Sequence, residues 1–163
     1  MNYNKIRKMD ISNGPGVRVS IFMQGCTFNC KNCFNPETHD FNKGNKLTDE
    51  VIDEIINISN FDYIKGLSIL GGEPLHSKNI EATLLLAKKY KEAYKDKTIW
   101  VWTGFLYEDI KNKDIFNYID VLVDGRFVEE KKDPTLKYKG STNQRVIDVK
   151  KTIKNEKIVL YED

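Results

Sequence analysis

The most informative segment of the chain is VRVSIFMQGCTFNCKNC, residues 17–33. Between residues 17 and 23 the odd-numbered positions are aliphatic or methionine, whereas the even-numbered ones hold Arg18, Ser20 and Phe22. A period of two is typical of a strand with two unlike faces. The segment therefore predicts a strand, the first of the chain, that ends just before a loop rich in cysteine.

That loop holds all three cysteines of the chain, Cys26, Cys30 and Cys33, in the spacing C-x3-C-x2-C. An odd number of thiols cannot pair completely, and the N-terminus lacks a secretory signal, so we expect a cytoplasmic protein with reduced thiols. Two kinds of metal centre suit the spacing. Three thiolates can hold a 4Fe-4S cluster with one iron left open, and His39 could complete a Cys3His zinc site. Polar neighbours disfavour a third interpretation, three cysteines packed in an apolar core.

Beyond this loop, the apolar positions predict alternating strands and helices. Helices are expected from the N-cap Thr48 to about Ser59, over residues 80–90 and over residues 107–116. Strands are expected at residues 66–70, 99–103, 121–123 and 146–149. This alternation indicates an α/β fold with a mostly parallel sheet. An eight-fold barrel needs about 250 residues, so we expect an open sheet or a partial (βα) barrel in one domain, residues 1–163.

Several loops in this pattern follow strands and have unusual composition. They are the cysteine loop, Gly71-Gly72-Glu73-Pro74, Thr103-Gly104 and Asp124-Gly125. Because the carboxyl ends of parallel strands meet at one edge of a sheet, where ligands bind, we expect these loops to share one face.

Composition excludes several classes of protein. With 40% hydrophobic and 31% charged residues, and apolar runs of only a few residues, the chain is neither disordered, collagen-like nor membrane-spanning. The 26 basic and 24 acidic residues leave a formal charge of +2, which does not indicate nucleic acid or an anionic membrane as the main partner.

The cysteine spacing after the first strand, together with the Gly-Gly-Glu-Pro turn after a later one, resembles the radical S-adenosylmethionine enzymes. The resemblance implies a partial (βα) barrel of that type and a 4Fe-4S cluster held by the three cysteines. It also implies S-adenosyl-L-methionine bound at the open iron. The expected contacts of this cofactor are Asn32, Cys33, Phe34, Gly71, Gly72 and Glu73. Gly71 and Gly72 would allow close backbone approach, and Glu73 or nearby carbonyls could accept bonds from its amine.

Position 32 departs from the pattern. Radical enzymes at large often carry an aromatic residue there, and the subgroup discussed next commonly carries glycine. Phe34 could supply the apolar contact instead.

Five segments narrow the resemblance to the activating proteins of anaerobic ribonucleoside-triphosphate reductases, which are glycyl-radical-enzyme activating enzymes. They are residues 10–18, 33–38, 100–105, 123–127 and 140–145. The resemblance implies reductive cleavage of S-adenosylmethionine to a 5′-deoxyadenosyl radical, which removes a hydrogen from a glycine in the reductase large subunit. It also implies flavodoxin or ferredoxin as electron donor. Because a chain this short leaves little beyond the cofactor-binding core, a polypeptide loop is the expected substrate.

Two alternatives remain from the sequence. Within the same class, the partner could be pyruvate formate-lyase or another glycyl-radical enzyme. From a different class, a zinc-stabilised binding module would use the three cysteines and His39.

Only four of the 26 basic residues are arginine, and Arg18, Arg126 and Arg145 lie in the family segments. Their planar forks suit carboxylate or carbonyl oxygens, either in structural pairs or in contact with cofactor or partner. Asp124 could bind a monovalent cation, as in related activases, although a capped turn is the simpler interpretation. Trp100 and Trp102 are expected to pack. Both histidines are expected in loops, and no acid–base catalyst is required.

Overall fold

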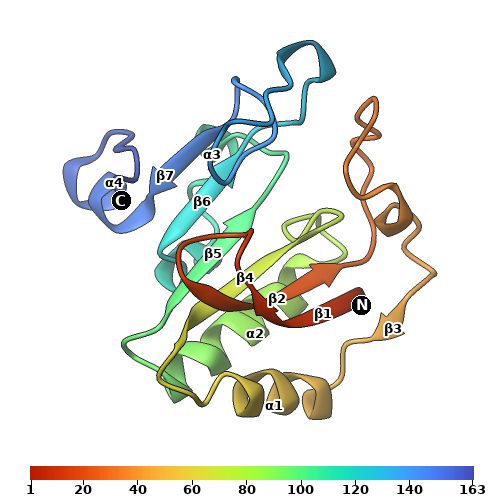
Figure 1. The fold of residues 1–163 in the computed structure, drawn as a ribbon, viewed down its shortest axis with the longest axis vertical. Helices are drawn as coiled ribbons and strands as arrows, with labels where there is room; N and C mark the ends of the chain where they lie inside the picture. Colours follow the sequence, from red (N-terminus) through yellow and green to blue (C-terminus); the bar gives the residue numbers. More distant parts are fainter.

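The computed structural model of the protein describes residues 1–163 and contains one seven-stranded sheet (Figure 1). The strands are β1 (Asn2–Asp10), β2 (Val17–Met23), β3 (Asn45–Lys46), β4 (Ile64–Gly71), β5 (Thr98–Trp102), β6 (Val121–Asp124) and β7 (Arg145–Asp148). The α-helices are α1 (Asp49–Ile58), α2 (Ile80–Ala93), α3 (Tyr107–Ile110) and α4 (Val149–Asn155). Across the sheet the strand order is β3-β1-β2-β4-β5-β6-β7.

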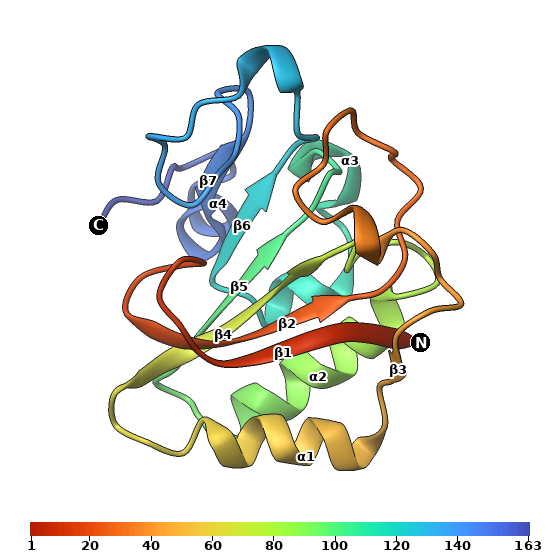
Figure 2. The ribbon, with the colours of Figure 1, turned by 45° about the vertical axis from the view of Figure 1, so that its right-hand side comes forward.

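The four central strands, β2, β4, β5 and β6, are parallel, and each is joined to the next through a helix-containing segment. Their order in the sheet follows the order in the chain, so right-handed crossovers place the connecting helices on the same face. Figure 2 shows α1 and α2 together on one side of the sheet. The predicted α/β class and parallel centre are confirmed.

The main hydrophobic core lies between the sheet and these helices and contains 23 buried residues. Thr48 caps α1 as expected, because its Oγ1 accepts a hydrogen bond from the Val51 N–H at 3.3 Å. In α2, Leu86, Ala87 and Tyr90 are fully buried against the sheet. The other face of the sheet is covered by loop segments instead. Ser68 of β4 bonds the Asn13 carbonyl there, and rings from residues 138 and 161 pack on Trp100.

Both edges of the sheet depart from the expectation. Strands β1 and β3 were not predicted. Strand β1 pairs antiparallel with β2, so the strand at residues 17–23 is the second of the chain, and β3 pairs antiparallel with β1 at the edge. Strand β7 occurs where a strand was expected, but it is antiparallel to β6. The connection between them has a 3-10 turn at Glu129–Lys131 and no α-helix, whereas parallel strands usually need a helical crossover.

The helices differ from the expectation at two places. The helix predicted over residues 107–116 ends at Ile110, and a 3-10 segment, Asp114–Asn117, follows. Helix α4 was not predicted. No helix in the structure is long and apolar enough to cross a bilayer.

Candidate functional site

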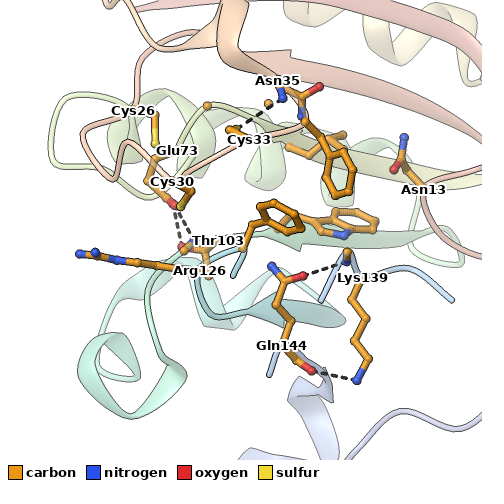
Figure 3. A pocket seen from close by; sticks show the side chains of 18 of the residues that line it. Asn13, Cys26, Cys30, Cys33, Asn35, Glu73, Thr103, Arg126, Lys139 and Gln144 are labelled. Carbon is orange, nitrogen blue, oxygen red and sulfur yellow. Dashed lines mark hydrogen bonds between the residues drawn. The ribbon is translucent and has the colours of Figure 1, made fainter. Parts of the chain in front are cut away.

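A cavity of about 520 Å³ lies at the carboxyl ends of the central strands and continues over the loop-covered face of the sheet. Its lining comes from the loops singled out in the sequence: Cys26, Cys30, Cys33, Phe34, Gly71, Gly72, Glu73, Thr103, Gly104, Gly125 and Arg126. Figure 3 shows the cysteines on one side of this cavity and Asn13 on the other. The structure therefore gathers the four loops at one site, as their positions after parallel strands predict.

The three cysteines are half-buried free thiols that all line the cavity. Burial raises the pKa of the Cys26 and Cys33 thiols, so their use as ligands requires a metal charge that favours the thiolate. No three His, Cys, Asp or Glu side chains surround a single point as ligands of one ion, which does not favour a Cys3His zinc site. In a 4Fe-4S cluster each thiolate binds a different iron, so the sulfurs need not converge. The donor set fits a cluster better than one ion.

Backbone pairing holds the cysteine loop against the end of β2. The Gly25 N–H donates to the Thr38 carbonyl at 2.6 Å, and the Cys26 N–H donates to the His39 carbonyl at 3.1 Å. The Gln24 side-chain amide adds bonds to the carbonyls of Glu37 at 3.0 Å and of Asp40. Cys26 is thus held in place by residues 37–40, which follow Cys33 and return to the end of β2.

Gly71 and Gly72 are needed for close packing of backbone on backbone. Gly71 has a φ of +111°, and a Cβ there would lie 2.6 Å from the Met23 nitrogen. A Cβ on Gly72 would lie 2.5 Å from the Gly25 carbonyl oxygen. The sequence predicts that these glycines let the backbone approach a cofactor closely. The structure shows that they also let the turn pack against the backbone of β2 and of the cysteine loop. Any side chain here would push the turn away from the cysteine loop.

Glu73 joins the loop after β4 to the loop after β5. Its side chain is fully buried, and it accepts hydrogen bonds from the Gly104 N–H at 2.6 Å, the Thr103 hydroxyl at 2.7 Å and the Leu75 N–H at 2.9 Å. Burial outweighs these bonds and raises the pKa of Glu73 to about 7. The Glu73 side chain lines the cavity, and all the hydrogen bonds that it accepts come from groups of the protein.

Asn79 is a residue of this site that the sequence did not reveal. Its buried side-chain amide donates to the Gln24 carbonyl at 3.1 Å and to the Glu73 carbonyl at 3.0 Å, so it ties the ends of two strand loops together. An Asn directly before a helix is usually predicted to cap the helix N-terminus with its side chain. Here it makes no capping bond, because the amide serves the site instead.

Asn32 and Phe34 lie differently from each other. Asn32 is exposed, has a φ of +54°, and does not line the cavity. That left-handed conformation favours glycine and is best tolerated otherwise by Asn or Asp. Phe34 lines the cavity, with its ring 4.7 Å from that of Phe127 and packed against Gly140. Phe34 therefore connects the cysteine loop to the segment after β6.

The three arginines of the family segments have distinct surroundings. Arg18 is fully buried and donates to the Ser68 hydroxyl at 2.9 Å and the Thr98 carbonyl at 2.8 Å, so its role is structural. Arg126 lines the cavity, lies 4.6 Å from the centre of the Phe28 ring, and forms no ion pair within the protein. Of the three, only Arg126 is placed to meet a ligand.

Arg145 binds the carboxylate of Asp124. Its guanidinium donates to the two Asp124 oxygens at 3.0 and 2.5 Å, and it also bonds Glu108. The Asp124 side chain is fully buried and accepts a further bond from the Tyr107 N–H at 2.9 Å. The structure therefore surrounds the Asp124 carboxylate with hydrogen-bond donors of the protein.

The wall of the cavity opposite the cysteine loop is the segment after β6. The Trp102 indole N–H donates to the Tyr138 carbonyl at 2.7 Å, and the Gln144 side-chain oxygen accepts from the Gly140 N–H at 2.8 Å. Lys139 donates to the Gln144 carbonyl, as Figure 3 shows. The expectation that Trp100 and Trp102 pack is met, since their rings lie 5.8 Å apart, although Trp102 also lines the cavity.

Known proteins resemble this chain over most of its length. Residues 12–147 match a family model described as a 4Fe-4S single cluster domain. An anaerobic ribonucleoside-triphosphate reductase-activating protein of Vibrio cholerae is 41% identical over 148 residues, which cover 88% of this chain and 96% of the relative. The corresponding protein of Escherichia coli K12 is 41% identical over 90% of this chain and 97% of its own length. That of bacteriophage T4 is 40% identical over 90% and 93%.

Proposed function

The chain belongs to the family of anaerobic ribonucleoside-triphosphate reductase-activating proteins, and we propose that it activates such a reductase by creating a glycyl radical in the reductase large subunit. We propose that it does so as a radical S-adenosylmethionine oxidoreductase. The observation that carries the proposal is the cavity in which three free cysteines face the Gly-Gly-Glu turn at the ends of parallel strands.

Cys26, Cys30 and Cys33 would each bind one iron of a 4Fe-4S cluster. Three protein ligands leave the fourth iron open, as a catalytic metal site requires. When bound, the reduced cluster and S-adenosyl-L-methionine supply the one-electron chemistry that removes a hydrogen atom from a glycine. The protein contributes position and shielding from water, which is its usual part in cofactor chemistry.

The methionyl end of the cofactor would lie beside Cys33 and the Gly71-Gly72-Glu73 turn. In this turn the N–H groups of Gly72 and Glu73 already donate to β2 and the cysteine loop, whereas the Gly72 carbonyl accepts no hydrogen bond. That oxygen is available to a cationic amine. Glu73 holds the turn in place through its bonds to the next loop.

The adenosyl end of the cofactor would be bounded by an aromatic side chain. Phe34 offers an apolar surface at the cavity wall, and Asn32 sets the backbone of the turn between two ligands. Arg126 lines the same cavity and has no acidic partner, so its planar fork would suit the carboxylate at the methionyl end of the cofactor.

The fold supports the same proposal. Strands that follow chain order, with the crossover helices on one face, suit a partial (βα) barrel of the radical S-adenosylmethionine type, formed by residues 1–163 as one domain. The loop-covered face would admit a polypeptide loop of the reductase. We place the protein in the cytoplasm with flavodoxin or ferredoxin as electron donor.

Anaerobic reconstitution with iron and sulfide tests the proposal. The protein should gain about four irons with equal sulfide, become reducible by dithionite, and cleave S-adenosylmethionine. Cys30→Ala should lose both the intact cluster and the cleavage, whereas Thr27→Ala, an exposed neighbour in the same loop, should keep both. A colourless protein that retains one tight zinc would instead support the zinc-stabilised module and contradict the proposal.

A further inference from the structure

His39 carries a polar atom for which the protein supplies no partner. It lines the cavity that holds the three cysteines. Its Nε2 atom is shielded from solvent and makes no hydrogen bond. Buried polar atoms are nearly always paired, so an unpaired one in a residue that lines a cavity points to a partner that arrives with the group bound there.

The backbone keeps His39 beside the first cysteine. The Cys26 N–H donates to the His39 carbonyl at 3.1 Å, so the two residues are direct neighbours across the loop. Thr38, the preceding residue, is fully buried, and its hydroxyl donates to the Asn35 carbonyl at 2.6 Å. The His39 N–H donates to the Pro36 carbonyl and so completes a short 3-10 turn, Pro36–Thr38. The imidazole is thus attached to a segment with a fixed path.

The second histidine of the chain shows that this arrangement is specific. His76 also lies in a loop, but its Nδ1 accepts a hydrogen bond from the Lys78 N–H at 3.0 Å, and its ring packs 4.7 Å from that of Phe41. It does not line the cavity. His76 therefore provides a natural control for His39.

We propose that His39 Nε2 donates a hydrogen bond to a sulfur of the cluster, either a cysteine thiolate or a bridging sulfide, and thereby raises the reduction potential of the cluster. This inference rests on the proposed function. The reduced cluster carries one more negative charge than the oxidised one, and a donor to sulfur stabilises that charge. Groups just outside the ligand shell commonly orient and tune metal centres in this way. His39 is accordingly a positioning residue and not a ligand.

Redox titration of the reconstituted protein, followed by electron paramagnetic resonance of the reduced cluster, tests this directly. At one fixed solution potential, His39→Phe should lower the ratio of reduced to oxidised cluster about tenfold, which is ~59 mV for one electron. His39→Gln keeps a donor and should shift the midpoint less. His76→Phe should leave it unchanged. Equal midpoint potentials in wild type and His39→Phe would overturn the inference.

Wild-type protein labelled with 15N-histidine gives a second readout that requires no substitution. The chain has only two histidines, so pulsed resonance of the reduced cluster should show one weak nitrogen coupling. A strong coupling, typical of nitrogen bound to iron, would show that His39 is a ligand and would overturn the inference, as would no coupling. Wild type without any 4Fe-4S cluster would overturn the proposed function as well. An intact cluster with no histidine effect would overturn only the role of His39.

Discussion

The two faces of the central sheet are built from the same strands but carry opposite chemistry. The face under the helices contributes to a core of 23 buried apolar residues. The face toward the cavity buries Arg18, Ser20 and Ser68, and its apolar cluster has only three buried residues. Stability therefore resides mainly on the helix face, whereas the cavity face holds polar groups that must each find a hydrogen bond.

The register of the strands keeps these two chemistries apart. In the parallel pairing of β2 with β4, Ser20 lies opposite Ser68 and Ile21 lies opposite Ile69. Since neighbouring positions point to opposite faces, polar groups line up on one side and aliphatic groups on the other. Substitutions on the helix face should therefore act on folding alone, whereas those on the cavity face should also act on the site.

The largest effect on stability is expected on the helix face. Leu86→Ala removes a fully buried side chain from α2 and should lower the free energy of unfolding by about 2–5 kcal/mol. Its neighbour Leu85 is 41% exposed, and Leu85→Ala should cost well under half as much. Urea denaturation of the metal-free protein measures both. Equal losses would mean that the core does not lie between α2 and the sheet.

A pH-dependent effect, at most comparable in size, is expected at the cavity from Glu73→Gln. The folded protein keeps the Glu73 proton until its raised pKa of about 7, whereas the unfolded chain releases it near 4.5. Between these two pH values the unfolded state therefore binds fewer protons than the folded state. The free energy of unfolding of the wild type, relative to that of Glu73→Gln, should fall by about 3 kcal/mol as the pH rises through this range. Above pH 7 the difference should stay constant.

Denaturation curves at several pH values measure this difference. Glu54→Gln, at an exposed position on α1, serves as the control. The difference in unfolding free energy between the wild type and this variant should not change over the same pH range. A wild-type protein that gains stability over Glu73→Gln between pH 4.5 and 7 would contradict the burial of this carboxyl group.

The smallest effect is expected at the rim, where Asn32 lies outside the cavity lining with a φ of +54°. Asn32→Gly should relieve a conformation that L residues adopt reluctantly, and should raise stability by a few tenths of a kcal/mol. Iron content and affinity for S-adenosylmethionine should not change. A clear loss of affinity, measured by equilibrium binding, would show that the Asn32 side chain contacts the cofactor.

The central strands and helices could be predicted because their periodicity is local. Residues 17–23 alternate cleanly, and α1 begins at a capping threonine. Strand β1 escaped prediction because it lies near the sheet edge, and most of its positions are half-buried or exposed. The direction of β7 could not be predicted because no local pattern records how the chain returns from β6.

The candidate site divides in the same way. The cysteine spacing and the Gly71-Gly72 turn are visible in the sequence, and the structure brings them into one cavity. The partners of Arg18 are not visible, since Ser68 and Thr98 lie 50 and 80 residues further along the chain. The pairing of Asp124 with Arg145 likewise spans 21 residues and a change of strand direction. Long-range pairings of this kind belong to the fold and leave no local signal.

Electron paramagnetic resonance after mixing with each candidate partner distinguishes the two substrates. Reconstituted, reduced protein with S-adenosylmethionine would be incubated separately with an anaerobic ribonucleoside-triphosphate reductase and with pyruvate formate-lyase. We predict a glycyl radical signal in the reductase, absent in the lyase and absent with Cys30→Ala. A glycyl signal that arises only in the lyase would show that the reductase is not the partner.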